Sequence, residues 1–225
     1  MMIKNIKRSN RKTLALYILK DGSLEIRAPK NVSEAVISDF ILSKRDWIKK
    51  HTEKARERNI KKNEFSVKIG DSLLYKGKEY KLLPKEGNSL SFDYENFYMP
   101  DNITFEALKP AFISLYRKLA KTEIIKKAEY YSKIMNVEYS NIKINSAKTR
   151  WGSCSGKNSL NFSWKLILAD DDTVSYVVVH ELAHIIEHNH SAEFWKTVER
   201  FFPNYKECKK KLKQLQKKLS MENWD

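Results

Sequence analysis

The chain has 225 residues, 41% of them hydrophobic and 12% aromatic, so it can bury a core and is not a disordered chain. Its net charge of +15 makes nucleic acid a candidate partner of the basic surface, although no motif of a known nucleic-acid-binding module is present. No apolar run approaches the roughly 18 residues of a membrane helix, so no membrane association is expected. The apolar run 14–19 is too short for a signal peptide, and a cytoplasmic location is therefore predicted.

The first part of the chain is predicted to be β-rich with one helix. Asp21-Gly22 separates two segments of alternating apolar residues and predicts a hairpin. Ser33 is expected to cap a helix, and the charged stretch 51–63 to form the end of that helix and a solvated connection. Further strands are predicted at 65–69, 73–83 and 88–99. These elements predict an N-terminal β-rich domain over residues 1–100.

From residue 104 the apolar residues recur at helical spacing, and this pattern continues toward Ile134. Strands follow at 137–146 and 160–168, with a turn between them. Asp170 and Ser191 are candidate N-caps of two further helices. The last helices are amphipathic with a basic face. This order of elements predicts a second domain over residues 104–225.

Four of the five histidines lie between positions 180 and 190, within a run that contains His-Glu-x-x-His. Residues four apart lie on the same face of a helix, so His180 and His184 can bind one Zn²⁺ ion. The adjacent Glu181 is the candidate general base, because a carboxylate so placed can take a proton from the attacking water. We expect Glu181 to share the histidine face while Val179 and Leu182 pack on the core. The motif predicts a zinc-dependent hydrolase.

A catalytic zinc site needs a third protein ligand, and several residues after the motif could supply it. His188 is four residues past His184, but three ligands spaced by four along one helix lie on a line and cannot easily surround an ion. Geometry therefore favours His190, with Asn189 as a candidate left-handed residue in the turn before it. Glu187 and Glu193 are the carboxylate alternatives.

The segment 148–154 carries an arginine, a tryptophan and a glycine in the predicted turn between two strands. Arg150 and Trp151 could form a rigid wall beside the site, whereas packing of Trp151 in the core explains the pattern equally well. The donor that would stabilise the oxyanion stays open among Arg150, His188 and Tyr176. The two cysteines are expected to be thiols.

Several motifs in the same order resemble the YgjP-like metallopeptidase family, which is related to the SprT-like and WLM zincins. The resemblance rests on 150–154, Leu160-Asn161-Phe162, 176–184, Asn189-His190-Ser191 and Phe194-Trp195, and on the N-terminal hairpin, Ala28-Pro29 and Asp46-Trp47-Ile48. It implies zinc ligation by His180, His184 and His190, with Glu181 as general base. Candidates for contacts with the substrate or the ligands are Arg150, Trp151, Asn161 and His188. The expected fold is α+β, a β-rich region with one helix followed by a minimal zincin-like domain.

Three functions are compatible with these motifs. The first is a zinc metallopeptidase whose protein or peptide substrate is held as an added strand beside segment 141–146 or 160–168. The second is a metal-dependent nucleotide phosphohydrolase at the same site, for which nearby lysines would match phosphate charge. The third is a basic nucleic-acid-binding protein with a structural zinc. Glu181 argues against the third, because a structural site has no use for a base beside its ligand.

Overall fold

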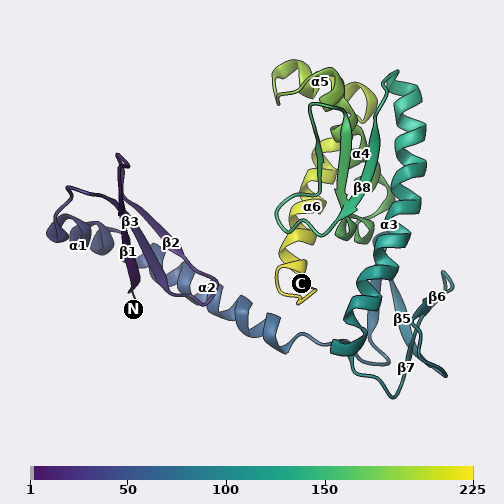
Figure 1. Ribbon diagram of the computed structural model, residues 1–225, viewed down its shortest axis with the longest axis horizontal. Helices are drawn as coiled ribbons and strands as arrows, with labels where there is room; N and C mark the ends of the chain where they lie inside the picture. Colours follow the sequence, from purple (N-terminus) through teal and green to yellow (C-terminus); the bar gives the residue numbers. More distant parts are fainter. Residues whose placement is uncertain (1–2, 225) are drawn as a thin grey trace. The chain divides into compact units, whose positions relative to one another are not determined.

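The computed structural model describes residues 3–224, which form two compact units, the first comprising residues 3–65 and 218–223 and the second residues 66–217 and Trp224. The elements of the first unit are β1 (Ile3–Ser9), β2 (Ala15–Ile18), β3 (Leu24–Pro29), α1 (Glu34–Ser43) and α2 (Arg45–Glu64) (Figure 1). The second unit contains β4 (Ser72–Tyr75), β5 (Lys78–Lys85), β6 (Ser91–Phe92), β7 (Phe97–Pro100), α3 (Phe105–Met135), β8 (Asn141–Asn145), β9 (Gly152–Cys154), β10 (Ser159–Ser163), η1 (Trp164–Leu168), α4 (Asp171–Ile186), α5 (Ala192–Phe201) and α6 (Tyr205–Leu219). Helices combined with three small sheets confirm the predicted α+β class.

The first unit is a three-stranded sheet in which β3 pairs with β2 in antiparallel and with β1 in parallel orientation. The β2–β3 connection is the predicted hairpin, and Gly22 there has a φ of +79° that favours glycine. Ile26 packs with Ile37 and Ile48 in the small core of this unit. Strand β1 was not predicted, because its lysine and arginine residues obscure the apolar alternation.

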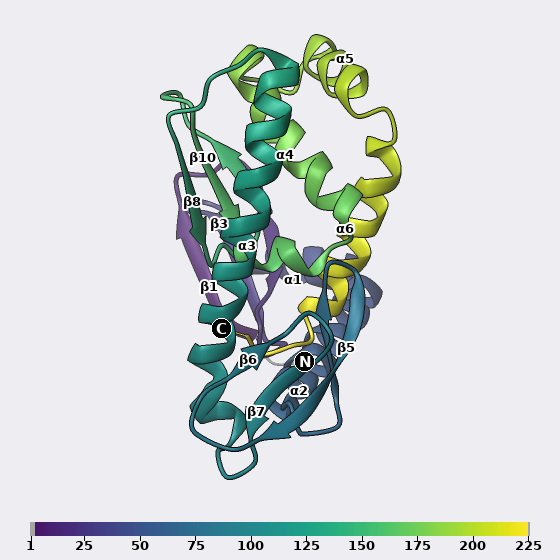
Figure 2. The ribbon, with the colours of Figure 1, turned by 90° about the vertical axis from the view of Figure 1, so that its right-hand side faces the viewer.

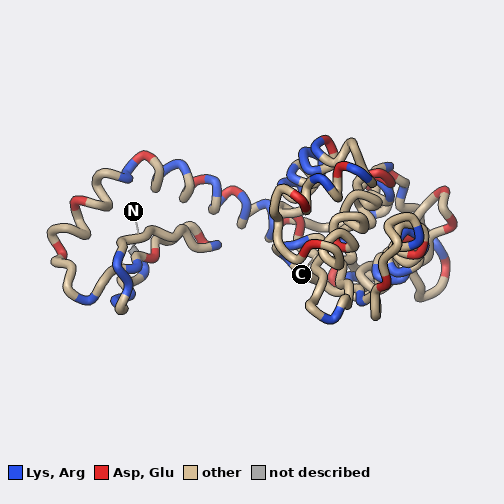
Figure 3. The backbone as a smooth tube through the Cα atoms, turned by 90° about the horizontal axis from the view of Figure 1, so that it is seen from above, with Lys and Arg blue, Asp and Glu red and all other residues tan. Residues whose placement is uncertain are grey.

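The prediction that residues 51–63 contain a helix end and a solvated connection is wrong, since α2 continues to Glu64. Its sequence lacks an apolar stripe, but it is rich in lysine, arginine and glutamate, which favour a helix even on an exposed surface. Lys and Arg outnumber Asp and Glu along this helix (Figure 3). The N-terminal part therefore contains two helices, separated at Lys44.

Residues 72–100 group with the second unit, whereas the sequence analysis placed them in the N-terminal domain. Their four strands have the order β4-β5-β7-β6. The turn between β4 and β5 is held by main-chain hydrogen bonds to η1, in which the N–H groups of Lys76 and Gly77 donate to the carbonyls of Ile167 and Leu168. Such contacts join segments that are far apart in the chain, and no local sequence pattern predicts them. The expected strand at 65–69 is not formed.

The core of the second unit is built on α3, which runs beside β8, η1 and α4 (Figure 2). Pro110 lies inside α3 without ending it. The ring of Tyr116 stacks on that of Trp164, with 5.5 Å between centroids, and Trp224 packs edge-on against both. Among residues 3–224, no helix has the length and apolar character needed to cross a membrane.

The sheet that positions the site has the order β8-β10-β9, with β10 parallel to β8 and antiparallel to β9. The prediction of one strand over 160–168 is wrong in its second half, where the chain turns into the buried 3₁₀-helix η1. The predicted turn around residues 150–154 contains instead the short edge strand β9. Helix α4 begins at the predicted cap, where the Asp170 carboxylate accepts a hydrogen bond from the N–H of Thr173.

Candidate active site

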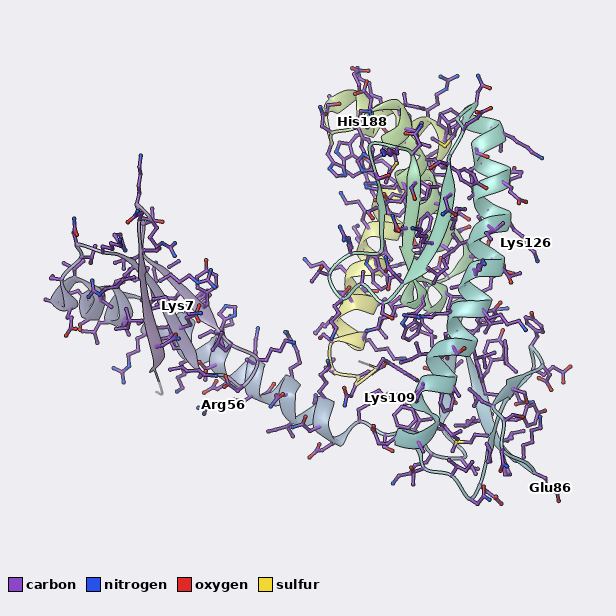
Figure 4. All side chains as sticks on the ribbon, viewed as in Figure 1. Lys7, Arg56, Glu86, Lys109, Lys126 and His188 are labelled. Atoms are coloured by element: carbon purple, nitrogen blue, oxygen red, sulfur yellow. The ribbon has the colours of Figure 1, made fainter. Side chains whose placement is uncertain are left out.

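The two histidines of α4 meet a third from the segment that follows it. His180, His184 and His190 each place a ring nitrogen within 4.8 Å of the others. The Nε2 atoms of His180 and His190 are 3.1 Å apart. Two nitrogens bound to one tetrahedral zinc at about 2.0–2.1 Å would lie about 3.3 Å apart, so the separation of His180 and His190 fits this ion. His188 is exposed and is not part of the cluster (Figure 4).

The turn after α4 brings His190 back toward the helix. The helix ends at Ile186, and Glu187 adopts extended backbone with a φ of −132°. Asn189 is not among the described residues with positive φ, so the prediction of a left-handed Asn189 is wrong. Its side-chain oxygen instead accepts a hydrogen bond from the N–H of Ser191, whose hydroxyl in turn caps α5. Two successive polar caps thus build the turn without a left-handed residue.

Neighbouring groups orient the histidine rings. His184 Nδ1 lies 3.2 Å from the main-chain carbonyl oxygen of Glu187, which fixes the protonated nitrogen and leaves Nε2 for a metal. The Phe194 ring packs against all three imidazoles, at 4.5 to 4.9 Å between centroids. Burial lowers the pKa of His180 to about 3, and the neighbouring His184 and His190 act in the same direction. His180 is therefore neutral, as ligation requires, even in mildly acidic solution.

Glu181 is enclosed between α4 and β9, and its residue is only 4% exposed. A β-carbon added to Gly152 would lie 2.5 Å from its Oε1, so only glycine leaves room for this carboxylate. Burial raises the pKa of Glu181 to about 8, while the charge of Arg150 and a hydrogen bond from the Cys154 main-chain N–H oppose the increase. The expectation that Glu181 shares an open face with the histidines was incomplete, since β9 covers it.

The remaining candidate residues differ in their distance from the cluster. Arg150 is exposed, and its charge acts on Glu181. Trp151 is half-buried and contributes its carbonyl to the sheet, where it accepts the N–H of Ser163. Asn161 lies on the central strand β10, opposite Ser153. Within the part of the chain that the structure describes, no contact joins the side chain of Trp151 or Asn161 to the histidines.

The structure also shows the positions of the two alternative carboxylate ligands and of the tyrosine considered as an oxyanion donor. Tyr176 is buried one turn before His180, with its ring packed near Tyr205, so it is not exposed as an oxyanion donor. Glu187 contributes its main-chain carbonyl to the site, through His184. Glu193 is exposed and pairs with Lys196 at 2.7 Å.

Sequence reasoning missed an aromatic stack beside the cluster. The ring of Trp195 stacks on that of His190, with 5.7 Å between centroids. It also stacks on the ring of Tyr205, with 5.3 Å between centroids. Lys209 Nζ lies 4.3 Å from the centroid of the Trp195 ring. The position of Trp195 soon after the Ser191 cap was visible in the sequence, but its pairing with α6 depends on tertiary structure.

A histidine cluster on and after a His-Glu-x-x-His helix, with a buried glutamate beside it, defines the class of metal-dependent hydrolases. The profile described as "YgjP-like, metallopeptidase domain" matches residues 12–215, and the chain belongs to this family. The resemblance inferred from the motifs is thereby confirmed, and the protein is a metal-dependent hydrolase of a peptidase family. A metallopeptidase family implies a divalent metal and a peptide or protein substrate.

Two solved structures are similar to this chain. The metallopeptidase zymogen of Pyrococcus abyssi abylysin is 23% identical, with a TM-score of 0.38, over 44% of this chain and 97% of that one. The metallopeptidase zymogen of Methanocaldococcus jannaschii jannalysin is 24% identical, with a TM-score of 0.37, over 40% of this chain and 94% of that one. Comparison with curated proteins gives no significant match.

Proposed function

We propose that this protein is a zinc-dependent metallopeptidase in which His180, His184 and His190 hold the ion and Glu181 is the general base. The observation that carries the proposal is the convergence of three imidazole nitrogens beside a buried carboxylate. Three imidazoles suit Zn²⁺ and leave a fourth position open, as in catalytic sites. When bound, zinc supplies Lewis-acid charge that activates water and polarises the scissile carbonyl.

Glu181 would take a proton from the attacking water and deliver it to the leaving amine. The Cys154 N–H holds one side of its carboxylate, and the absence of a side chain at Gly152 lets β9 approach it. Enclosure by α4 and β9 restricts the carboxylate to one orientation, which is what proton transfer requires. A cation at the histidines favours the ionised form of Glu181 and so opposes the effect of burial on its pKa.

The edge of β9 that faces away from β10 is the proposed support for an extended peptide, which would pair with the main chain of Gly152, since the Cys154 N–H is bound by Glu181. The carbonyl of Trp151 accepts from Ser163 N–H, so Trp151 and Ser153 direct their main-chain groups toward β10. Gly152 and Cys154 therefore direct theirs away from β10, beside Glu181. A peptide paired with β9 would lie next to the catalytic carboxylate. Strand β9 replaces segments 141–146 and 160–168 as the candidate support for the peptide. Strand β10 is paired on both sides, and β8 lies at the opposite edge of the sheet from β9.

Metal removal and restoration test the proposal. The zinc-loaded protein would be assayed against an unstructured protein substrate and, in parallel, against nucleoside triphosphates. We expect cleavage of the protein substrate, loss of cleavage after chelation, and recovery when zinc is added back. Turnover of triphosphates without peptide cleavage would replace the proposal with the phosphohydrolase alternative. Bound zinc with neither activity would contradict a hydrolytic role on these substrates and favour a structural zinc.

A further inference from the structure

We propose that the site is selective for acidic peptides, with Arg150 and Lys209 each binding a substrate carboxylate on a different side of the cleaved bond. This inference rests on the proposed peptidase function and names its substrate class. The two cations come from separate elements that flank the histidine cluster, one from the segment leading into β9 and the other from α6.

Lys209 is held near the cluster by aromatic stacking. Its Nζ lies 4.3 Å from the centroid of Trp195, and the Trp195 ring stacks on the imidazole of His190. The ammonium group and a candidate zinc ligand therefore contact the same indole ring. Its charge also contributes to lowering the pKa of His180, which supports this proximity. The residue is exposed, so a substrate can reach it.

Arg150 belongs to the segment that leads into β9, next to Glu181. It is exposed and lies two residues before Gly152, the residue whose backbone approaches Glu181. Its positive charge acts on the Glu181 carboxylate, which places it on the β9 side of the cluster. A peptide paired with the edge of β9 that faces away from β10 would pass this guanidinium, whose fork geometry suits a carboxylate.

Neither cation forms a salt bridge within residues 3–224, whereas several basic residues of the surrounding helices do. The paired ones are Lys196 with Glu193, Lys206 with Glu199, and Lys211 with Glu207 and Asp170. A cation without a salt bridge at the margin of a site can pair with an incoming carboxylate without first giving up another ion pair. Because the two cations flank the cluster on different elements, they would recognise two separate substrate positions.

The test uses one neutral parent peptide that the wild-type protein cleaves, and derivatives with a single Glu or Gln at each position around the bond. We expect kcat/KM to favour Glu over Gln by about 1.5- to fivefold at two positions, as is typical of an exposed ion pair. Arg150→Gln should abolish the preference at one position only, and Lys209→Gln at the other. Arg150→Glu and Lys209→Glu should each reverse it, so that Gln is preferred over Glu at that position.

Two matched variants serve as controls. Lys210→Gln removes a cation from the same helix as Lys209, and Lys157→Gln removes one from the turn after β9. Both should keep the wild-type preferences and cleave the neutral peptide at the wild-type rate. For the Arg150 and Lys209 variants, the readout is the ratio of kcat/KM for the Glu and Gln peptides, which cancels any change in the chemical step common to both. Equal rates for Glu and Gln peptides at every position would overturn acidic selectivity while leaving the peptidase function in place. Failure to cleave any peptide, with turnover of nucleoside triphosphates, would overturn both.

Discussion

Replacing Gly152 with alanine is expected to disable catalysis without removing the metal. The added β-carbon would lie 2.5 Å from Oε1 of Glu181, 2.7 Å from its Cγ and 2.8 Å from its Cδ. Ordinary contact begins near 3.5 Å, so the carboxylate would have to move by about 1 Å. The residue is only 4% exposed, and the neighbouring side chains leave it little space for this shift. The backbone of residue 152 does not have the positive φ that would disfavour alanine in its own right.

A displacement of about 1 Å costs roughly 100-fold in rate for a catalytic group, and complete loss of a general base costs up to about 10⁴-fold. We therefore expect kcat/KM of Gly152→Ala to fall by at least about 100-fold. Zinc affinity, measured by competition with a chelating dye, should change little, because the three atoms nearest the added β-carbon belong to Glu181 and not to a histidine. The melting temperature should fall only modestly.

Gly156→Ala is the matched control, since it lies in the adjacent turn and an added β-carbon would meet no atom within 4 Å. This variant should retain wild-type activity. Wild-type kcat/KM for Gly152→Ala would refute the reasoning, because it would mean that the position of Glu181 against β9 is not needed. Equal losses in both variants would mean that the effect comes from the loop backbone and not from the carboxylate.

Three further predictions concern the ligands, the buried charges and the basic surface. Loss of a residue that supports a zinc ligand typically costs about 10- to 100-fold in zinc affinity. Because His190 is proposed as a ligand itself, His190→Ala should weaken zinc binding by more than about 100-fold. His188→Ala should leave zinc affinity unchanged, and a larger loss for His188→Ala than for His190→Ala would reassign the third ligand. Without metal, Glu181 keeps its proton up to about pH 8 in the folded protein and loses it near pH 4.5 in the unfolded chain. The opposing contribution of His180, whose unfolded pKa is 6.5, is largely complete by about pH 7. The free energy of unfolding should therefore decrease by about 1 kcal/mol between about pH 7 and 8 in chelator, and Glu181→Gln should abolish this decrease; a flat wild-type profile would contradict it. If nucleic acid binds the basic surface, the affinity for duplex DNA should fall steeply as salt rises from about 50 to 200 mM. Weak binding whose affinity does not change with salt would exclude nucleic acid as a partner.

The local parts of the structure could be predicted from the sequence, and the non-local parts could not. The spacing of His180 and His184 fixes their common face on a helix, and the Asp21-Gly22 turn fixes a hairpin, because both depend on residues close in the chain. Spacing also favoured His190, but only the return of the chain to α5 brings it to the cluster. The enclosure of Glu181 was missed, since it depends on a strand more than 25 residues earlier in the chain.

The errors have physical reasons of the same kind. Strand β1 and helix α2 carry many charged residues and little apolar periodicity, so the pattern that normally reveals an element was absent. The alternation in 160–168 continued past the true end of β10, because every residue of η1 except Lys165 is buried regardless of its backbone conformation. Tertiary contacts, and not periodicity, decide where that strand ends.

The most direct test of the central claim compares wild-type protein with Glu181→Gln, measuring zinc content and cleavage of an unstructured protein in the same samples. Glutamine keeps the size of the side chain but cannot accept the proton. The account predicts about one zinc per chain in both proteins and a loss of cleavage by at least about 100-fold in the variant. Cleavage by zinc-loaded Glu181→Gln at the wild-type rate, or wild-type protein that binds no zinc, would contradict it.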